Sequence, residues 1–111
     1  MGQPPAAVEI AVVLRRLELP RPFVLFLGRV SRDKGAIVAS EAIQRLTNSG
    51  SSPCLALAGQ IAHEFGRYFG RLPQEARAKV RPLGPVNELT KQVLLASTEM
   101  LVLPSRVDSF G

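Results

Sequence analysis

The alternation of short apolar runs with longer amphipathic segments is the feature that most constrains how this chain of 111 residues can fold. Four apolar runs, each followed by a glycine or a proline, are candidate strands: residues 23–27, 54–58, 80–83 and 100–103. Between the first two, Val38, Ala42 and Leu46 recur at the spacing of one helical face. Strands that alternate with helices pair in parallel through right-handed crossovers, so the pattern predicts an α/β fold: a Rossmann-like parallel sheet of about four strands with flanking helices.

The segment before the first strand is predicted to be a lead-in rather than part of the sheet. Within residues 1–22, apolar positions favour a short amphipathic helix over residues 6–19, which Pro20 and Pro22 would end. Residues 23–111 then form the predicted domain, although the sheet of a whole domain of this kind would continue beyond them.

Two further helical regions are predicted in the second half of the chain. One runs over residues 61–79 with a break near Pro73, and the other begins after Asn87, which is a good helix N-cap. Aromatic residues in the first region have helical spacing, which favours packing in the core over stacking on nucleic-acid bases: Phe65, Tyr68 and Phe69.

The net charge of +5 limits the choice of partners but does not decide it. Arginines supply 11 of the 14 cations and are scattered along the chain, so the plainest interpretation is a solvated basic surface, and nucleic acid is not expected as a partner. Anionic ligands and an acidic membrane surface remain alternatives.

The cysteine content and the lack of a long apolar stretch indicate the compartment. Cys54 is the one cysteine, and no apolar stretch reaches the ~18 residues of a membrane span. A cytoplasmic protein is therefore expected, with peripheral contact at the inner face of the membrane as an option.

The loop after the first strand carries two cations between two glycines. Gly28 allows close backbone approach to a ligand, Arg29 presents a planar fork of donors, and Lys34 presents a mobile positive charge before Gly35. In open α/β sheets ligands bind at the carboxyl ends of the strands, so a phosphate-bearing ligand is expected there. The loop matches neither the Walker A motif nor the dinucleotide fingerprint, and a solvated strand–helix turn is the alternative.

The same edge of the sheet would collect the loops that follow the other strands. Parallel strands end together, so the segment 104–111 is expected beside the first loop. The topology would thus bring Arg29, Lys34 and Asp108 together although they lie far apart in the sequence.

These motifs, taken in order, resemble the C-terminal domain of retaining glycosyltransferases of the GT-B fold. They are Gly28-Arg29 with Lys34-Gly35, then Leu83-Gly84-Pro85-Val86, then Leu103-Pro104-Ser105 with Asp108, Phe110 and Gly111. The resemblance is greatest to the glycosyltransferase group 1, or GT4-type, family and extends from about Phe23 to Gly111.

The resemblance implies roles for three groups of residues. The diphosphate of a nucleotide-sugar would be held by Gly28, Arg29 and Lys34. The base would be contacted, mainly through backbone groups, by Arg81, Pro82 and Leu83. The donor sugar would be held by Asp108, Phe110 and Gly111, although the family usually has glutamate at the position of Asp108.

The implied activity is transfer of a sugar, with retention, from a nucleotide-diphosphate sugar such as a UDP- or GDP-sugar to an acceptor, without a metal or other cofactor. No complete set of catalytic residues is expected in these 111 residues, because the family's acceptor domain would precede them. The chain alone is therefore expected to be inactive, and its partners would be the donor and that N-terminal domain.

Two alternatives to a transferase part remain at this stage. One is a non-catalytic Rossmann-like module that binds a nucleotide or phosphate, or that regulates another protein. The other is a truncated, non-functional piece. In either case the open edge after the fourth strand would favour self-association.

Overall fold

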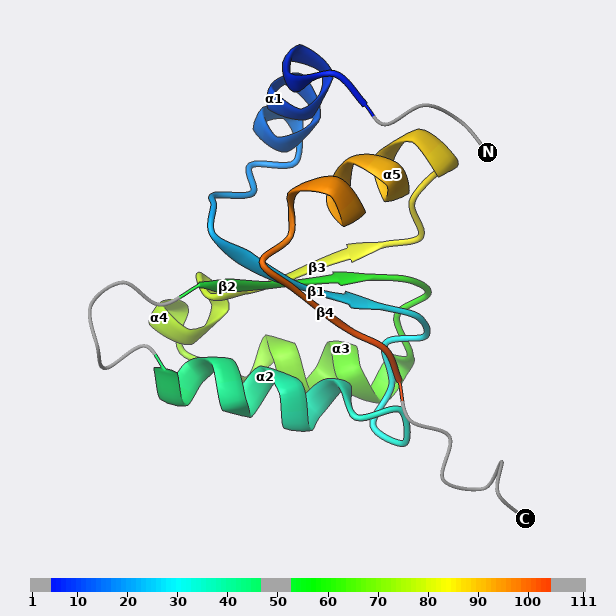
Figure 1. The fold of residues 1–111 in the computed structure, drawn as a ribbon. Helices are drawn as coiled ribbons and strands as arrows, with labels where there is room; N and C mark the ends of the chain where they lie inside the picture. The colour runs from blue at the N-terminus through cyan, green and yellow to red at the C-terminus, as the bar shows by residue number, and fades with distance from the viewer. Residues whose placement is uncertain (1–4, 47–52, 105–111) are drawn as a thin grey trace.

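The computed structural model of the chain describes residues 5–46 and 53–104 and has three layers, with a parallel sheet between two layers of helices (Figure 1). The elements follow in the order α1 (Ala7–Arg16), β1 (Phe23–Leu27), α2 (Ala36–Arg45), β2 (Cys54–Ala58), α3 (His63–Gly70), α4 (Gln74–Arg77), β3 (Val80–Gly84), α5 (Glu88–Ser97) and β4 (Met100–Val102). The predicted α/β class and the Rossmann-like parallel sheet are confirmed.

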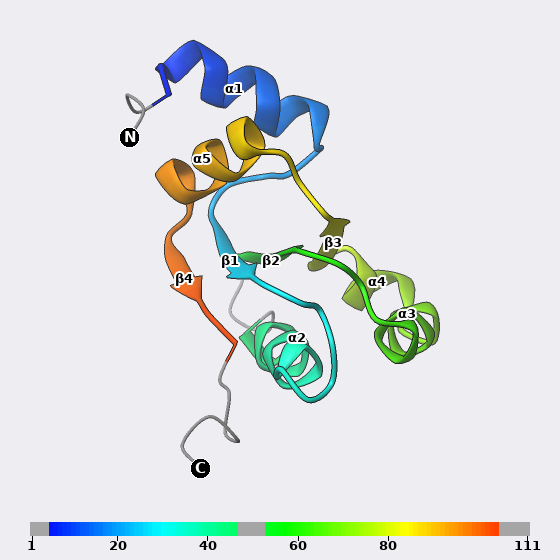
Figure 2. The same cartoon turned by 90° about the vertical axis from the view of Figure 1, so that its right-hand side faces the viewer.

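The four strands lie in the order β3-β2-β1-β4, and every neighbouring pair is parallel. The chain moves outward from β1 to β2 and β3, and then returns to place β4 on the other side of β1. Helices α1 and α5 cover one face of the sheet, whereas α2, α3 and α4 lie on the other (Figure 2). The order of the strands therefore reverses between β1 and β4, which is where open α/β sheets bind ligands.

The central strand β1 contributes to both hydrophobic cores because its side chains alternate between the two faces. Leu25 is fully buried with Leu14 of α1 and Leu94 of α5. Phe26, its neighbour, is buried on the other face with Ile43 of α2 and Phe65 of α3. The helix predicted within residues 1–22 thus packs on the same core as the sheet.

One helix end differs from the sequence pattern, and the predicted break in another helical region is confirmed. Helix α1 ends at Arg16 instead of near Leu19, because Glu18 adopts a left-handed conformation and Leu19 N–H donates to Leu14 O at 3.0 Å. The region 61–79 divides into α3 and α4, with the predicted break at Pro73. No helix in the part of the chain that the structure describes is long and apolar enough to cross a membrane.

Strand β4 exposes apolar side chains at the edge of the sheet. Met100 is 60% exposed and Leu101 is 41% exposed, although both belong to a strand. Leu103, directly after the strand, is 63% exposed. An apolar edge of this kind is a site for further pairing or covering, and self-association through it stays a prediction.

Asn87 is the N-cap of α5, as the sequence predicts. Its side-chain oxygen accepts a hydrogen bond from Thr90 N–H at 2.8 Å. Replacing Asn87 by alanine leaves that N–H without its partner and is expected to lower the free energy of unfolding by about 1 kcal/mol, measured by urea denaturation. Asn87→Asp keeps an accepting oxygen and should stay close to the wild type, so equal stability of the alanine and aspartate variants would contradict this role.

Candidate functional site

The loops after β1 and β2 are bonded to each other at the carboxyl edge of the sheet. Gly28 N–H donates to Ala58 O at 2.9 Å, and Val30 N–H donates to Gln60 O at 2.9 Å. Val30 O in turn accepts from Ala62 N–H at 2.9 Å. These bonds continue the parallel pairing past the ends of the strands, so the loop that carries the two predicted cations starts from a fixed position.

Two glycines allow the backbones at this edge to approach closely. A Cβ on Gly59 would lie 1.9 Å from Gly28 O, and Gly59 has a φ of +150°. A Cβ on Gly28 would lie 2.6 Å from Cγ of Pro104, which follows β4. The ends of β1, β2 and β4 therefore meet at Gly28, in the place where the strand order reverses.

A compact turn leads from Gly28 to α2. Ser31 is buried, its hydroxyl donates to Asp33 Oδ1 at 2.7 Å, and its carbonyl oxygen accepts from Ala36 N–H at 3.0 Å. The hydrogen bond from Ser31 is the main reason why the pKa of Asp33 lies below its ordinary value, and the positive charges of Lys34 and Arg29 lower it further. The two cations predicted to bind phosphate thus both lie near the Asp33 carboxylate.

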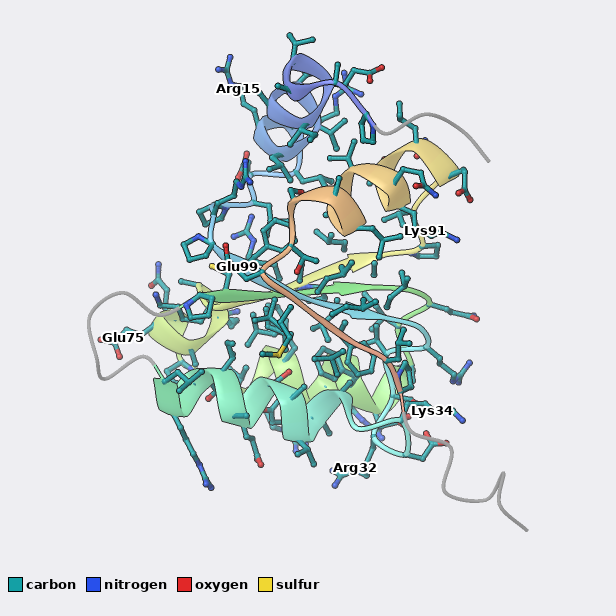
Figure 3. The ribbon with its side chains drawn as sticks, in the orientation of Figure 1. Arg15, Arg32, Lys34, Glu75, Lys91 and Glu99 are labelled. Atoms are coloured by element: carbon teal, nitrogen blue, oxygen red, sulfur yellow. The ribbon has the colours of Figure 1, made fainter. Side chains whose placement is uncertain are left out.

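Lys34 is half-buried at the edge of the sheet where the strands end, as Figure 3 shows, and Arg29 is exposed. The structure therefore brings together on one loop the three residues predicted to hold a diphosphate, Gly28, Arg29 and Lys34. Their binding of a diphosphate stays a prediction.

Glu64, in the first turn of α3, is a residue of this edge that the sequence analysis did not predict. Its Oε2 accepts a hydrogen bond from Arg32 N–H at 3.2 Å. That bond is the largest cause of a pKa below the ordinary glutamate value, and the charge of Arg29 acts in the same direction. Glu64 is therefore a carboxylate that fixes the loop to α3 and lies within the electrostatic reach of Arg29.

Of the residues predicted to contact a base, Arg81 has a structural contact of its own. Its Nη2 donates to Glu18 O at 3.0 Å, which joins β3 to the end of α1. Pro82 and Leu83 are half-buried further along the same edge strand, where the register with β2 shifts between Leu57 and Ala58, an irregularity of the kind that accommodates a proline. Their binding of a base through backbone groups stays a prediction.

The residues predicted to hold the donor sugar, Asp108, Phe110 and Gly111, lie outside the described residues. The described chain ends at Pro104, which contacts the position of Gly28 and precedes Asp108 by four residues in the sequence.

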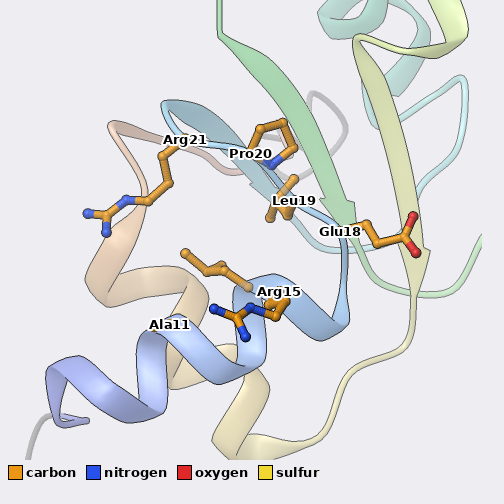
Figure 4. Close-up of a pocket in the computed structure, with 7 residues that line it drawn as sticks. Ala11, Arg15, Glu18, Leu19, Pro20 and Arg21 are labelled. Carbon is orange, nitrogen blue, oxygen red and sulfur yellow. The ribbon is translucent and has the colours of Figure 1, made fainter.

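A wide hollow of about 620 Å³ lies at the other edge of the sheet, between α1 and the segment that leads into β1 (Figure 4). Apolar groups such as Leu14, Leu19 and Pro20 form much of its lining, and Arg15 and Arg21 lie at its side. None of the residues predicted to bind the donor lines it. The carboxyl edge, with its cations and close backbone contacts, is therefore the better candidate site.

Fold and site together define an α/β domain with a loop that carries two cations at the switch point of a parallel sheet. Among solved structures, the chain is similar to that of AviGT4, a glycosyltransferase involved in avilamycin A biosynthesis, with a TM-score of 0.57 and 30% sequence identity. The match covers 78% of this chain but 24% of the AviGT4 chain, so this sequence corresponds to a part of that enzyme. The resemblance seen in the sequence is confirmed as a relationship to a GT4 glycosyltransferase.

No protein-family model matches the chain. No curated protein matches it either. The relationship therefore rests on the shared fold and the sequence identity over the matched region.

Proposed function

We propose that this chain is the donor-binding part of a retaining glycosyltransferase and holds a nucleotide-diphosphate sugar at the carboxyl edge of its sheet. The observation that carries the proposal is the position of the Gly28–Gly35 loop. It places Arg29 and Lys34 at the switch point of a parallel sheet, beside the end of β4, in a chain related to a GT4 glycosyltransferase.

The loop has the chemistry that departure of a diphosphate requires. When the bond from the sugar to the donor phosphate breaks, negative charge grows on the leaving oxygen, and cations already in place stabilise it. Arg29 would bind two phosphate oxygens as a fork, and Lys34 would neutralise charge as a mobile ammonium. The positive end of the α2 dipole would add to the attraction, so the mechanism needs no metal ion.

Asp33 and Glu64 place negative charge near Arg29 without pairing with it. Both carboxylates have a pKa below the ordinary value, so both are charged at neutral pH, and the charge of Arg29 is a minor cause of each shift. In residues 5–46 and 53–104 neither carboxylate forms an ion pair with Arg29 within 4.0 Å. The N–H groups of Arg29 would therefore be available to the diphosphate.

The remaining contacts to the donor are proposals that follow the same relationship. Asp108 would accept hydrogen bonds from hydroxyls of the sugar, and backbone amides near Phe110 and Gly111 would hold the sugar and the phosphate. The backbone of Arg81, Pro82 and Leu83 would contact the base. The acceptor would bind to another part of the whole enzyme, so this chain alone is expected to bind a donor without transferring its sugar.

Calorimetric titration with UDP and GDP tests the proposal. We expect the double variant Arg29→Gln/Lys34→Gln to bind the preferred nucleotide roughly 10- to 100-fold more weakly, because two charge-assisted contacts are lost. The matched control, Arg45→Gln/Lys79→Gln, removes the same charge near the opposite edge of the sheet and should keep the wild-type affinity. Unchanged affinity in the first variant, or equal losses in both, would contradict a diphosphate site at this loop.

A further inference from the structure

A second cationic hollow lies on the face of the sheet that carries α2 and α3. Its volume is about 300 Å³, and it is lined by Arg32, Glu64, Arg67, Tyr68, Arg71 and Leu72. Three exposed arginines and one glutamate therefore line the same hollow. Arg32 belongs to the Gly28–Gly35 loop but points away from the sheet, whereas Lys34 lies at the carboxyl edge (Figure 3), so the hollow lies next to the proposed donor site and shares this loop with it.

The arginines of this hollow have no carboxylate of their own to pair with. Arg67 and Arg71 are four residues apart and so lie on one side of α3, where like charges repel each other. In residues 5–46 and 53–104 the one ion pair within 4.0 Å joins Lys91 to Glu88, far from this hollow in the sequence. The dipole of α3 favours a cation near the helix end, but that gives neither arginine an anionic partner.

The carboxylate of the hollow is already engaged. Glu64 accepts the hydrogen bond from Arg32 N–H, and this bond lowers its pKa, so Glu64 stays ionised at neutral pH. Its single charge offsets that of one arginine. A net positive charge remains at the hollow for a ligand from solution.

Tyr68 adds a fixed hydroxyl to the lining. Its oxygen accepts a hydrogen bond from Gln44 Nε2 at 3.0 Å, and its ring packs against buried Phe65 with 5.6 Å between the ring centroids. A phenol that accepts one hydrogen bond still has its own O–H to donate. The hollow thus combines guanidinium forks with a directed O–H donor, a combination that suits phosphate oxygens.

We propose that this hollow is a second anion site, which binds a phosphate group through Arg32, Arg67, Arg71 and Tyr68. The ligand class is a phosphate or phosphomonoester. It could belong to a soluble phosphorylated compound or to the headgroup of an acidic lipid, and both would present the same oxygens to the arginines. Neither source requires the donor site to be occupied.

Site-resolved NMR with inorganic phosphate tests the soluble source. We expect saturable shifts of the Arg67 and Arg71 side-chain N–H signals and of the Tyr68 amide. In Arg67→Gln/Arg71→Gln the shift at Tyr68 should saturate at a phosphate concentration about tenfold higher. The control Arg15→Gln/Arg16→Gln removes the same charge from α1, on the opposite face of the sheet, and should behave as the wild type.

Cosedimentation with vesicles tests the lipid source. Binding to vesicles that contain phosphatidic acid, but not to phosphatidylcholine vesicles, that is lost in Arg67→Gln/Arg71→Gln and kept in Arg15→Gln/Arg16→Gln would assign the site to a lipid headgroup. A saturable response to inorganic phosphate alone would assign it to a soluble ligand, and both results together would support the shared phosphate chemistry. The proposal is overturned if neither probe binds at α3, or if the α1 variant loses as much binding as the α3 variant.

Discussion

Replacing Gly59 by alanine is expected to lower the free energy of unfolding by about 3 kcal/mol or more. The new Cβ would lie 1.9 Å from Gly28 O and 2.6 Å from Gly28 C, and the neighbour is backbone, which cannot rotate away. The φ of +150° adds strain that a side chain makes worse. For a domain of this size, the loss lowers Tm by roughly 12 °C or more in a circular dichroism melt.

Gly66→Ala is the matched control, because it makes the same substitution in the same half of the chain. Gly66 lies within α3, and a Cβ there would meet no atom within 4 Å. Alanine is the better helix former, so this variant is expected to gain about 0.5–1 kcal/mol. If Gly59→Ala melts at the wild-type temperature, the backbones of the β1 and β2 loops do not approach as closely as described here.

Phe65→Ala is expected to cost about 3–5 kcal/mol of stability, measured by urea denaturation. Phe65 belongs to α3, and its side chain is fully buried in the cluster that also contains Phe26, Ile43 and Leu57. Removing the ring leaves a cavity that the sheet and α2 cannot close without moving.

Phe69→Ala tests whether burial, rather than the loss of any aromatic ring from α3, sets that cost. Phe69 lies on the same helix, one turn later, and is only half-buried against the same cluster. Its replacement should cost clearly less than that of Phe65. Equal losses of stability in the two variants would mean that burial of the Phe65 ring does not set the cost of its removal.

The sequence alone was sufficient to predict the strands of this fold, because three of them are runs of apolar residues and each of the four ends at, or within two residues of, a glycine or proline. The strand order was not predicted. Whether β4 pairs with β1 or with β3 depends on contacts between distant residues, such as the bond of Thr98 Oγ1 to Phe23 O across 75 residues. The end of α1 was misplaced for a similar reason, since the left-handed Glu18 leaves no local pattern in the sequence.

The place of Arg29 and Lys34 was predictable because both lie in the loop that follows a strand, whereas their binding of a phosphate stays a prediction. Glu64 was missed because its partner is a backbone N–H 32 residues away, and nothing in the residues around it indicates that contact. The contact of Arg81 with Glu18 O spans 63 residues and was hidden in the same way. Motifs thus indicate which cations follow a strand, whereas the backbone contacts of Glu64 and Arg81 become visible only in three dimensions.

The central place of β1 affects how the chain can fold while it is being synthesised. Its partner β2 leaves the ribosome soon afterwards, but the residues that close its other side, Thr98 and β4, come more than 70 residues later. Until then the apolar sequence Phe23–Leu27 has one unpaired edge, which is open to wrong partners. In a nascent chain of this topology, either rapid synthesis of β4 or binding of a chaperone is therefore needed to keep the free edge of β1 from aggregating.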